Sequence, residues 1–501
     1  MSIFANVKKS EPVTAFLPVG GLLDIPTAAI VEGVNGEYII NGGFGPLSGV
    51  AGKPHMFKST IAKSILYIAT LRLLTTLRQT SALLYDTEMT VVEAHQVEIF
   101  EHLINHFHDL RPFFYNDGVI MDLIGENLIV FTNKNQYKGE EYYELLKRVV
   151  QAKDPATKRS RDDTDLAKGF EMLETNFKDR DGSRLKMLPP SLGDVDGITE
   201  FTTSYDEEIQ DDHKLGDQQA NPAFMKMGLN KQRFLMGLPG LLTTYQHYMM
   251  MTCQVGKEIV MASGPTPAPA GKQLSSMKNG DVLKGAGSKF VSLATVCWQS
   301  LKTGHCGMSH KIEDGPRYPL HETKGNKFDN DLFEIELLNI RNKNGPTGFT
   351  ITILVSQSKG FLPDLSEFHY ARTNDWGFGG NQINYHLKLM PDVALTRTNI
   401  RKKLADVVGL QRAVNITSEM LQLKHFKPGW WQDYGCEVED LYENITKLGF
   451  SWEEILTKTR GWYSLDPNHP IKELSIIDLL RMNKGEYIPY WMDPATKRIK
   501  V

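Results

Sequence analysis

The sequence contains few cysteines, and their placement excludes two classes of protein. Four cysteines occur among 501 residues, without a C-x-x-C pair or a metal-ligand spacing to histidine. A disulfide-built secreted domain and a cysteine-based zinc site are therefore excluded. We expect buried, reduced thiols in a cytoplasmic protein.

We expect neither a secretory leader nor a membrane-spanning run in this chain. Residues 1–9 have no long apolar core, and the apolar stretch 65–77 is interrupted by Arg72. Neither sign of charge dominates, because 56 basic residues face 60 acidic ones. This balance excludes polyanion binding through overall charge, although a local basic groove remains open. We expect a soluble chain without membrane partners, whose 41% hydrophobic content supports one large or two moderate domains.

The most informative segment is residues 52–60, with the sequence GKPHMFKST. Its spacing is that of a phosphate-binding loop in which Phe57 replaces the second glycine. In such a loop, backbone N–H groups and a helix N-terminus bind phosphate oxygens. Lys58 would reach the β and γ phosphates of ATP, and the Ser59 hydroxyl would hold Mg²⁺. An ordinary surface turn is the alternative. The expected cofactor-binding residues are Gly52, Lys53, Pro54, His55, Met56, Phe57, Lys58, Ser59 and Thr60.

The flanking residues have the pattern that this motif requires. Residues 45–51 can form a short strand, and residues 61–69 have helical spacing without a breaker. The apolar run 82–85 then ends in acidic residues, as expected for a buried parallel strand whose carboxyl end faces a ligand. Glu88 is the candidate for positioning or activating the attacking water. The alternative for Glu88 is a solvated cluster at a helix N-terminus.

A second acidic strand end is expected within residues 185–201. Asp196 fits the role of a Mg²⁺-associated carboxylate, and Asp194 is the alternative. Two prolines and Gly193 make this segment a poor strand by its sequence. Another strand, residues 248–253, ends at Gln254, and its three methionines are typical of a core.

Basic residues gather in two later segments. A helix over residues 222–248 has a basic side, and residues 255–288 form a long loop without periodicity. Long loops of this kind are usually functional, and mobile lysines beside glycines can follow a phosphate backbone. A disordered insertion is the alternative. The expected DNA-binding residues are Lys231, Arg233, Lys257, Lys272, Lys278, Lys284, Gly285, Gly287 and Lys289.

The remaining segments define the expected organisation. Residues 1–40 could dock on a neighbouring subunit or cover the chain's own core. The charged segment 153–183 favours a solvated insertion over a basic arm. Residues 202–221 are expected to be an acidic loop, while 290–301, 332–340 and 348–356 have strand character. Beyond residue 385, helical patterns at 399–410, 438–447 and 452–458 indicate a smaller, mainly helical domain after a core of residues 41–380.

Taken in order, these motifs resemble the RecA family of strand-exchange recombinases, and within it the bacteriophage UvsX branch. That branch uses a loop of the form G-P-x-x-x-F-K-S, so Phe57 matches it. The resemblance covers about residues 25–365 and implies an α/β P-loop ATPase core with a mostly parallel central sheet flanked by helices. It further implies that Gln254 senses the γ-phosphate, and that residues 203–221 and 255–288 are DNA-binding loops.

The resemblance also implies residues that act across a subunit interface. The segment Ile340-Arg341-Asn342-Lys343 is similar to a basic turn that reaches the neighbour's ATP, which makes Arg341 and Lys343 trans-acting catalytic cations. The implied function is an ATP- and Mg²⁺-dependent recombinase that forms head-to-tail filaments on single-stranded DNA and pairs it with double-stranded DNA. Single-strand-binding and loader proteins are implied partners, in a host cytoplasm or nucleoid if the chain is phage-encoded.

Two other functions remain open from the sequence. A ring-forming replicative helicase would share the phosphate loop, Glu88 and a basic turn. A DNA-coating scaffold with a decayed nucleotide site would fit Phe57 and the poor strand before Asp196.

Overall fold

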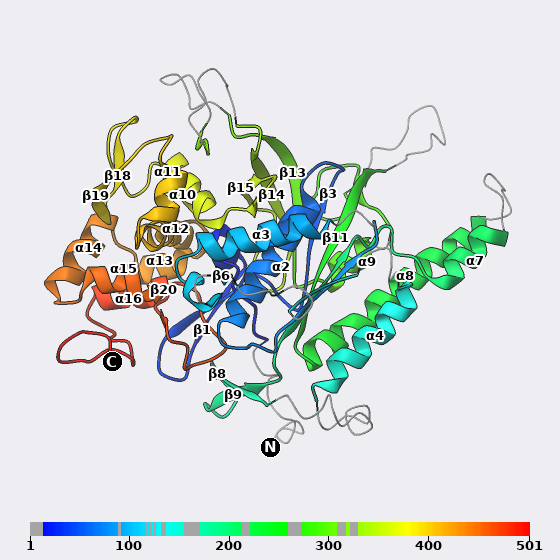
Figure 1. The fold of residues 1–501 in the computed structure, drawn as a ribbon, viewed down its shortest axis with the longest axis horizontal. Helices are drawn as coiled ribbons and strands as arrows, with labels where there is room; N and C mark the ends of the chain where they lie inside the picture. The colour runs from blue at the N-terminus through cyan, green and yellow to red at the C-terminus, as the bar shows by residue number, and fades with distance from the viewer. Residues whose placement is uncertain are drawn as a thin grey trace.

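A large sheet forms the centre of the protein in the computed structural model (Figure 1). The structure describes residues 14–88, 92–116, 119–120, 123, 127–131, 137–154, 171–212, 221–258, 272–285, 287–307, 317–320 and 329–500. The sheet order is β16-β15-β14-β13-β3-β11-β10-β4-β7, and β12 pairs with β11. Its strands are β3 (Leu47–Gly52), β4 (Ala82–Asp86), β7 (Leu128–Phe131), β10 (Ser191–Asp196), β11 (His247–Lys257), β12 (Asp281–Leu283), β13 (Val296–His305), β14 (Leu332–Asn342), β15 (Thr350–Ser356) and β16 (Gly360–Phe361).

The sheet is parallel from β13 to β7 and antiparallel from β13 to β16. Helices cover both faces, as the alternation along β11 shows. Met250 packs in the core that contains α2 (Lys58–Leu74) and α3 (Glu93–His106). Met249 and Met251 pack in the core that contains α4 (Gly139–Ala152), α8 (Asn221–Thr244) and α9 (Gly287–Leu293). The expected mostly parallel sheet flanked by helices is therefore confirmed.

The C-terminal third forms a separate hydrophobic cluster beside the antiparallel part of the sheet. Its elements are α10 (Pro363–Thr373), β17 (Phe378–Gly380), β18 (Tyr385–Leu387), β19 (Met390–Leu395), α11 (Ile400–Asp406), α12 (Leu410–Phe426), α13 (Pro428–Tyr434), α14 (Val438–Lys447), α15 (Trp452–Lys458), β20 (Thr459–Arg460), β21 (Lys472–Glu473) and α16 (Ile476–Asn483). The helices α14 and α15 coincide with the predicted ranges. Helix α12 is buried along most of its length, so the other helices pack around it.

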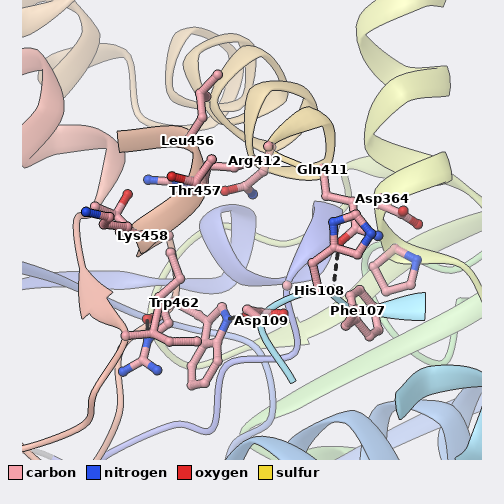
Figure 2. Close-up of a pocket in the computed structure, with 18 of the residues that line it drawn as sticks. Phe107, His108, Asp109, Asp364, Gln411, Arg412, Leu456, Thr457, Lys458 and Trp462 are labelled. Carbon is pink, nitrogen blue, oxygen red and sulfur yellow. Dashed lines mark hydrogen bonds between the residues drawn. The ribbon is translucent and has the colours of Figure 1, made fainter. Parts of the chain in front are cut away.

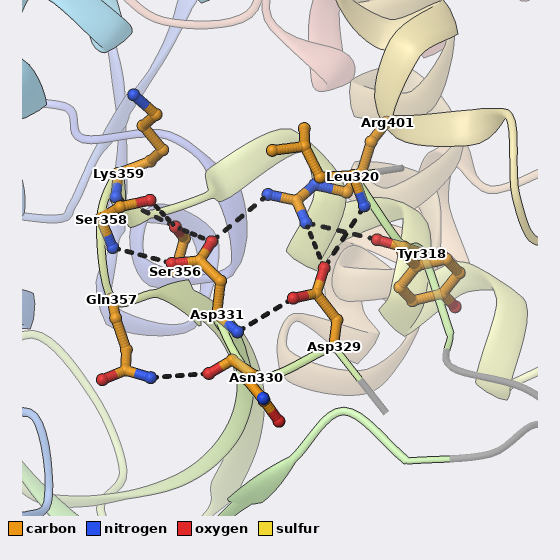
Figure 3. Close-up of polar contacts among 10 residues, drawn as sticks. All are labelled: Tyr318, Leu320, Asp329, Asn330, Asp331, Ser356, Gln357, Ser358, Lys359 and Arg401. Atoms are coloured by element: carbon orange, nitrogen blue, oxygen red, sulfur yellow. Dashed lines mark hydrogen bonds and ion pairs between the residues drawn. The ribbon is translucent and has the colours of Figure 1, made fainter. Parts of the chain in front are cut away.

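A buried arginine fixes α11 to the sheet (Figure 3). The Arg401 Nη1 atom lies 3.1 Å from Asp329 Oδ2, and its Nη2 lies 3.8 Å from Asp331 Oδ2. Asp331 also accepts hydrogen bonds from the Ser356 hydroxyl at 2.5 Å and the Ser358 N–H at 2.9 Å. One guanidinium thus joins the C-terminal helices to the turn between β15 and β16 and to the start of β14.

The N-terminal residues from position 14 onward cover the chain's own core. This segment contains η1 (Gly21–Leu23), α1 (Asp24–Thr27), β1 (Ala29–Glu32) and β2 (Tyr38–Asn41). Phe16 and Leu17 are buried against the sheet, and Leu17 forms a bridge with Phe44. Of the two interpretations of residues 1–40, the structure supports the covering one for 14–40. Residues 1–13 lie outside the described residues.

Two loop predictions and part of one strand prediction were wrong where the structure describes them. Within 202–221, residues 204–212 form α7 (Ser204–Asp212), whose start is capped because Asp206 accepts from the Thr203 N–H at 2.9 Å. Within 255–288, β11 runs on to Lys257 and pairs with β12, and α9 begins at Gly287. Helix α9 also occupies the first residues of the predicted strand 290–301.

The remaining short elements lie between the major ones. They are η2 (Arg111–Phe113), β5 (Tyr115–Asn116), β6 (Val119–Ile120), β8 (Leu173–Lys178) and β9 (Arg184–Met187). The hairpin β8–β9 occupies the end of the segment predicted as a solvated insertion. Among the described residues, no helix combines the length and apolar character needed to cross a membrane.

The buried residue Lys153 ties together the amino ends of β10 and β11. Its Nζ donates to Pro189 O at 2.9 Å, Ser191 Oγ at 3.0 Å and Gln246 O at 3.2 Å. Burial lowers the pKa of Lys153 to about 7, whereas an unfolded lysine titrates at about 10.4. Between these values the unfolded chain binds more protons, so this residue makes stability rise with pH.

We therefore expect Lys153→Met to flatten the pH dependence of stability between about pH 7 and 10, where the lysine contributes up to about 1.4 kcal/mol per pH unit. The measurement is the free energy of unfolding in urea across this range. Lys147→Met, on the more exposed side of α4, is the control and should keep the wild-type slope. An unchanged slope in Lys153→Met would contradict the assignment.

Candidate functional site

The connection between β3 and α2 has a tight, unusual backbone. Gly52 ends the strand, and a Cβ there would lie 3.1 Å from Lys58 Cγ and 3.3 Å from Ser300 Cβ. Phe57 precedes the helix with a φ of 56°, a conformation that costs a non-glycine residue about 1–2 kcal/mol. Its ring packs on Phe333 at a centroid distance of 4.7 Å. Phe57 thus lacks the backbone freedom of a glycine, but its ring holds the loop against β14 by packing on Phe333.

The first turn of α2 meets the end of β10 at Asp196. Asp196 Oδ1 accepts from Ser59 Oγ at 2.8 Å and from Thr252 Oγ1 at 2.7 Å. Its Oδ2 forms an ion pair with the buried Lys63 ammonium. Burial alone would raise the pKa of Asp196, but Lys63 and these hydrogen bonds hold it below its ordinary value. The carboxylate is therefore kept ionised beneath the loop.

Asp194 occupies a different environment from Asp196. Its Oδ1 accepts from the Tyr85 N–H at 2.9 Å, within the sheet. Burial raises the pKa of Asp194 to about 7, although Lys63 opposes the shift. Of the two candidate carboxylates, Asp196 is the one that contacts Ser59.

Glu88 lies close to this cluster because Thr87 joins the ends of β4 and β10. The Thr87 N–H donates to Asp196 O at 2.8 Å, and its hydroxyl donates to Gly197 O at 2.9 Å. Glu88 is exposed, and its backbone N–H donates to Asp86 Oδ1 at 3.2 Å. Partial burial, and then the charge of Asp196, raises the pKa of Glu88, while Lys58 opposes this. Glu88 therefore lies within electrostatic range of both Asp196, at the end of β10, and Lys58, at the start of α2.

Gln254 lies beside the end of β3, because its backbone pairs in register with Gly52. The side-chain amide of Gln254 donates to Glu200 Oε1 at 2.7 Å. Its backbone carbonyl accepts from the Lys284 N–H at 2.9 Å. Glu200 was not predicted from the sequence. Burial, and then the charge of Glu88, raises the pKa of Glu200. The only sequence signal for Glu200 is its place four residues after Asp196.

Arg341 and Lys343 lie at the opposite edge of the sheet from this cluster. Because β14 runs antiparallel to β13, its end reaches the amino end of β3, where Lys343 N–H donates to Thr295 O at 2.9 Å. The Lys343 Nζ donates to Leu293 O at 3.1 Å, and Arg341 Nε donates to Ala294 O at 3.4 Å. The structure therefore does not bring these two cations to Lys58 of the same chain.

The predicted DNA-binding residues differ in how accessible they are. Lys231 is buried, and its Nζ donates to Thr199 O at 2.5 Å, so it is not presented to solvent. Lys257 is ion-paired with Asp281 at 2.5 Å, and Gly287 is buried where a Cβ would lie 2.5 Å from Leu283 Cβ. The exposed members are Arg233, Lys257, Lys272, Lys278, Lys284 and Gly285, with Lys289 half-buried.

The loop and its neighbours have donors suited to a nucleotide and a hard cation. The Lys58 ammonium folds back to Lys53 O at 3.3 Å, which leaves its charge at the mouth of the loop. The Ser59 hydroxyl and the Asp196 carboxylate are oxygen ligands of the kind that Mg²⁺ prefers. A cavity of about 340 Å³ lies next to Ser59, Thr60 and Lys63. These residues fit Mg²⁺ and phosphate.

No protein-family model matches the chain, and no curated protein matches it either.

The contribution of the Lys63–Asp196 ion pair to the stability of the fold can be tested by substitution. Lys63→Met leaves a buried carboxylate without its cation, and we expect a loss of about 3–5 kcal/mol in the free energy of unfolding. The double variant Lys63→Met/Asp196→Asn removes both charges and should recover a large part of that loss. Urea unfolding of the two single variants and the double variant measures the coupling. Additive losses would contradict the ion pair.

Proposed function

We propose that this chain is a RecA-type P-loop ATPase that acts as a DNA recombinase. The observation that carries the proposal is the hydrogen bond between Ser59 and Asp196 at 2.8 Å. This bond joins the proposed phosphate loop, between β3 and α2, to the acidic end of β10, which is separated from β3 by β11 alone. Both lie at the carboxyl edge of the parallel strands, where such sheets bind their ligands. Glu88 and Gln254 reach the same edge.

In the proposed mechanism each residue has one task. Lys58 neutralises the γ-phosphate, and Ser59 with Asp196 would hold Mg²⁺, which supplies charge stabilisation to the phosphate oxygens. Glu88 orients the attacking water and accepts its proton. Lys63 keeps Asp196 ionised throughout, since their ion pair is buried.

Gln254 supports the proposed coupling between nucleotide and DNA. Its side chain holds Glu200, just before α7, and its backbone holds Lys284, at the end of the lysine-rich segment. A γ-phosphate that drew the Gln254 amide away from Glu200 would free the residue just before one proposed DNA-binding segment, while the backbone bond to Lys284 connects Gln254 to the other. Such an order–disorder step is a common switch in nucleotide hydrolases.

The position of Arg341 and Lys343 supports action in trans. They lie at the amino edge of the sheet, while the nucleotide loop lies at the carboxyl edge. A second copy packed head to tail would bring one edge against the other, and a heterologous contact that does not close gives a filament. A ring helicase built on the same contact is the alternative, and negative-stain images of filaments or hexamers distinguish the two.

The first experiment compares ATP hydrolysis with and without single-stranded DNA in the wild type and Glu88→Gln. We expect DNA to stimulate the wild type, and Glu88→Gln to lose about 10²–10⁴-fold in rate while still binding DNA. Lys58→Ala, which should lose nucleotide binding, is the matched control. No hydrolysis in the wild type under either condition would reject the catalytic proposal and leave a DNA-coating scaffold.

A mixing experiment tests the trans-acting cations. Arg341→Ala and Glu88→Gln should each be inactive alone, because each lacks one half of every site. Mixed subunits pair an intact Arg341 with an intact Glu88 at some interfaces, so part of the DNA-stimulated ATPase activity should return. If the mixture is no more active than its components, Arg341 does not act across an interface.

A further inference from the structure

A large cavity formed by the described residues lies away from the nucleotide loop. It has a volume of about 1010 Å³ and lies between the end of α2, residues 107–113 and the C-terminal helices (Figure 2). Figure 2 shows Phe107 and His108 on one side, Leu456 and Thr457 on another, and Trp462 beside Asp109. A cavity of this volume accommodates a small organic molecule.

The wall of this cavity contains a buried arginine with unused hydrogen-bonding capacity. Arg72 is 9% exposed, and its Nε and Nη1 find no hydrogen-bond partner among the described residues. Its guanidinium stacks on Trp462, with Cζ 4.7 Å from the ring centroid. Buried guanidinium groups normally bond to a carboxylate or phosphate, so these free N–H groups indicate a missing anionic partner.

The carboxylates nearest to Arg72 are engaged elsewhere. Asp24 accepts from the N–H groups of Val19 at 3.0 Å and Gly20 at 2.6 Å. Asp109 accepts from Trp462 Nε1 at 2.7 Å, and Glu367 accepts from Asn415 Nδ2 at 3.0 Å. These groups compensate the charge of Arg72 through space without bonding to its Nε or Nη1.

Protonation weakens the negative charge in this wall further. Burial raises the pKa of Glu419 to about 7, although Arg412 opposes the shift. Burial likewise raises the pKa of Glu367 well above its usual range. Glu367 and Glu419, whose charges act on the buried Arg72 and Arg412, are therefore less than fully ionised near neutral pH.

We propose that this cavity is a second ligand site, which binds a small organic molecule carrying a carboxylate or a phosphate group. Arg72 bonds the anionic group, and Trp462 and Leu456 contact the apolar part of the molecule. The site is separate from the nucleotide loop, because Arg72 lies in the last turn of α2 and Lys58 in its first.

The test uses isothermal titration calorimetry on the full chain with phenyl phosphate, benzoate and putrescine. The first two probes distinguish a phosphate from a carboxylate ligand, and the diamine tests the opposite charge. We expect binding of at least one anionic probe with a dissociation constant of about 1 mM or tighter. Lys58→Ala should bind it unchanged, which excludes the nucleotide loop as the source of the heat.

Two variants locate the binding. Arg72→Gln removes the charge, and Thr457→Trp places a ring at the mouth of the cavity, where Thr457 is exposed and the buried charges stay intact. Each should weaken binding tenfold or more, and Thr457→Trp covers the case in which Arg72→Gln fails to fold. The proposal is overturned if neither anion binds at about 1 mM, if only putrescine binds, or if Thr457→Trp binds as tightly as the wild type.

Discussion

The buried Asp196 carboxylate is the group on which the arrangement of the candidate site depends. It links the first turn of α2 through Ser59, the end of β11 through Thr252, and the interior of α2 through Lys63. A single ionised group at the end of β10 thus fixes where the helix begins relative to the sheet. Removing one ion from such a network leaves its partner as an uncompensated buried charge. A substitution here is therefore expected to change both the geometry of the loop and the local stability.

The sheet separates the proposed chemistry into two groups at opposite edges. Lys58, Glu88 and Gln254 belong to the carboxyl edge, while Arg341 and Lys343 rest on the carbonyls that end α9 near the amino edge. Arg401 holds the C-terminal helices to the antiparallel side of the sheet. This division is what the proposed assembly requires, because the proposed complete site takes residues from both edges.

The sequence was sufficient for elements defined by local pattern and insufficient for those defined by partners. The strand and helix on either side of residues 53–57, the strand before Glu88 and helices α14 and α15 follow from spacing and apolar periodicity. The strand before Asp196 has a weak pattern, yet it lies buried between β4 and β11, where Gly193 fits against Leu83 O and Asp194 Oδ1 accepts from the Tyr85 N–H. Glu200 and the Lys63 ion pair escaped prediction for the same reason: their significance comes from residues far away in the chain.

The separation of Lys58 from Arg341 has a consequence for counting. If each complete site takes its loop from one subunit and its cations from the next, an open filament of n subunits contains n − 1 complete sites, while a closed ring of n contains n. Turnover per subunit would then rise with filament length, and short oligomers would be disproportionately inactive. One terminal subunit would hold a nucleotide that it hydrolyses only slowly, which would make the two ends of a filament chemically different.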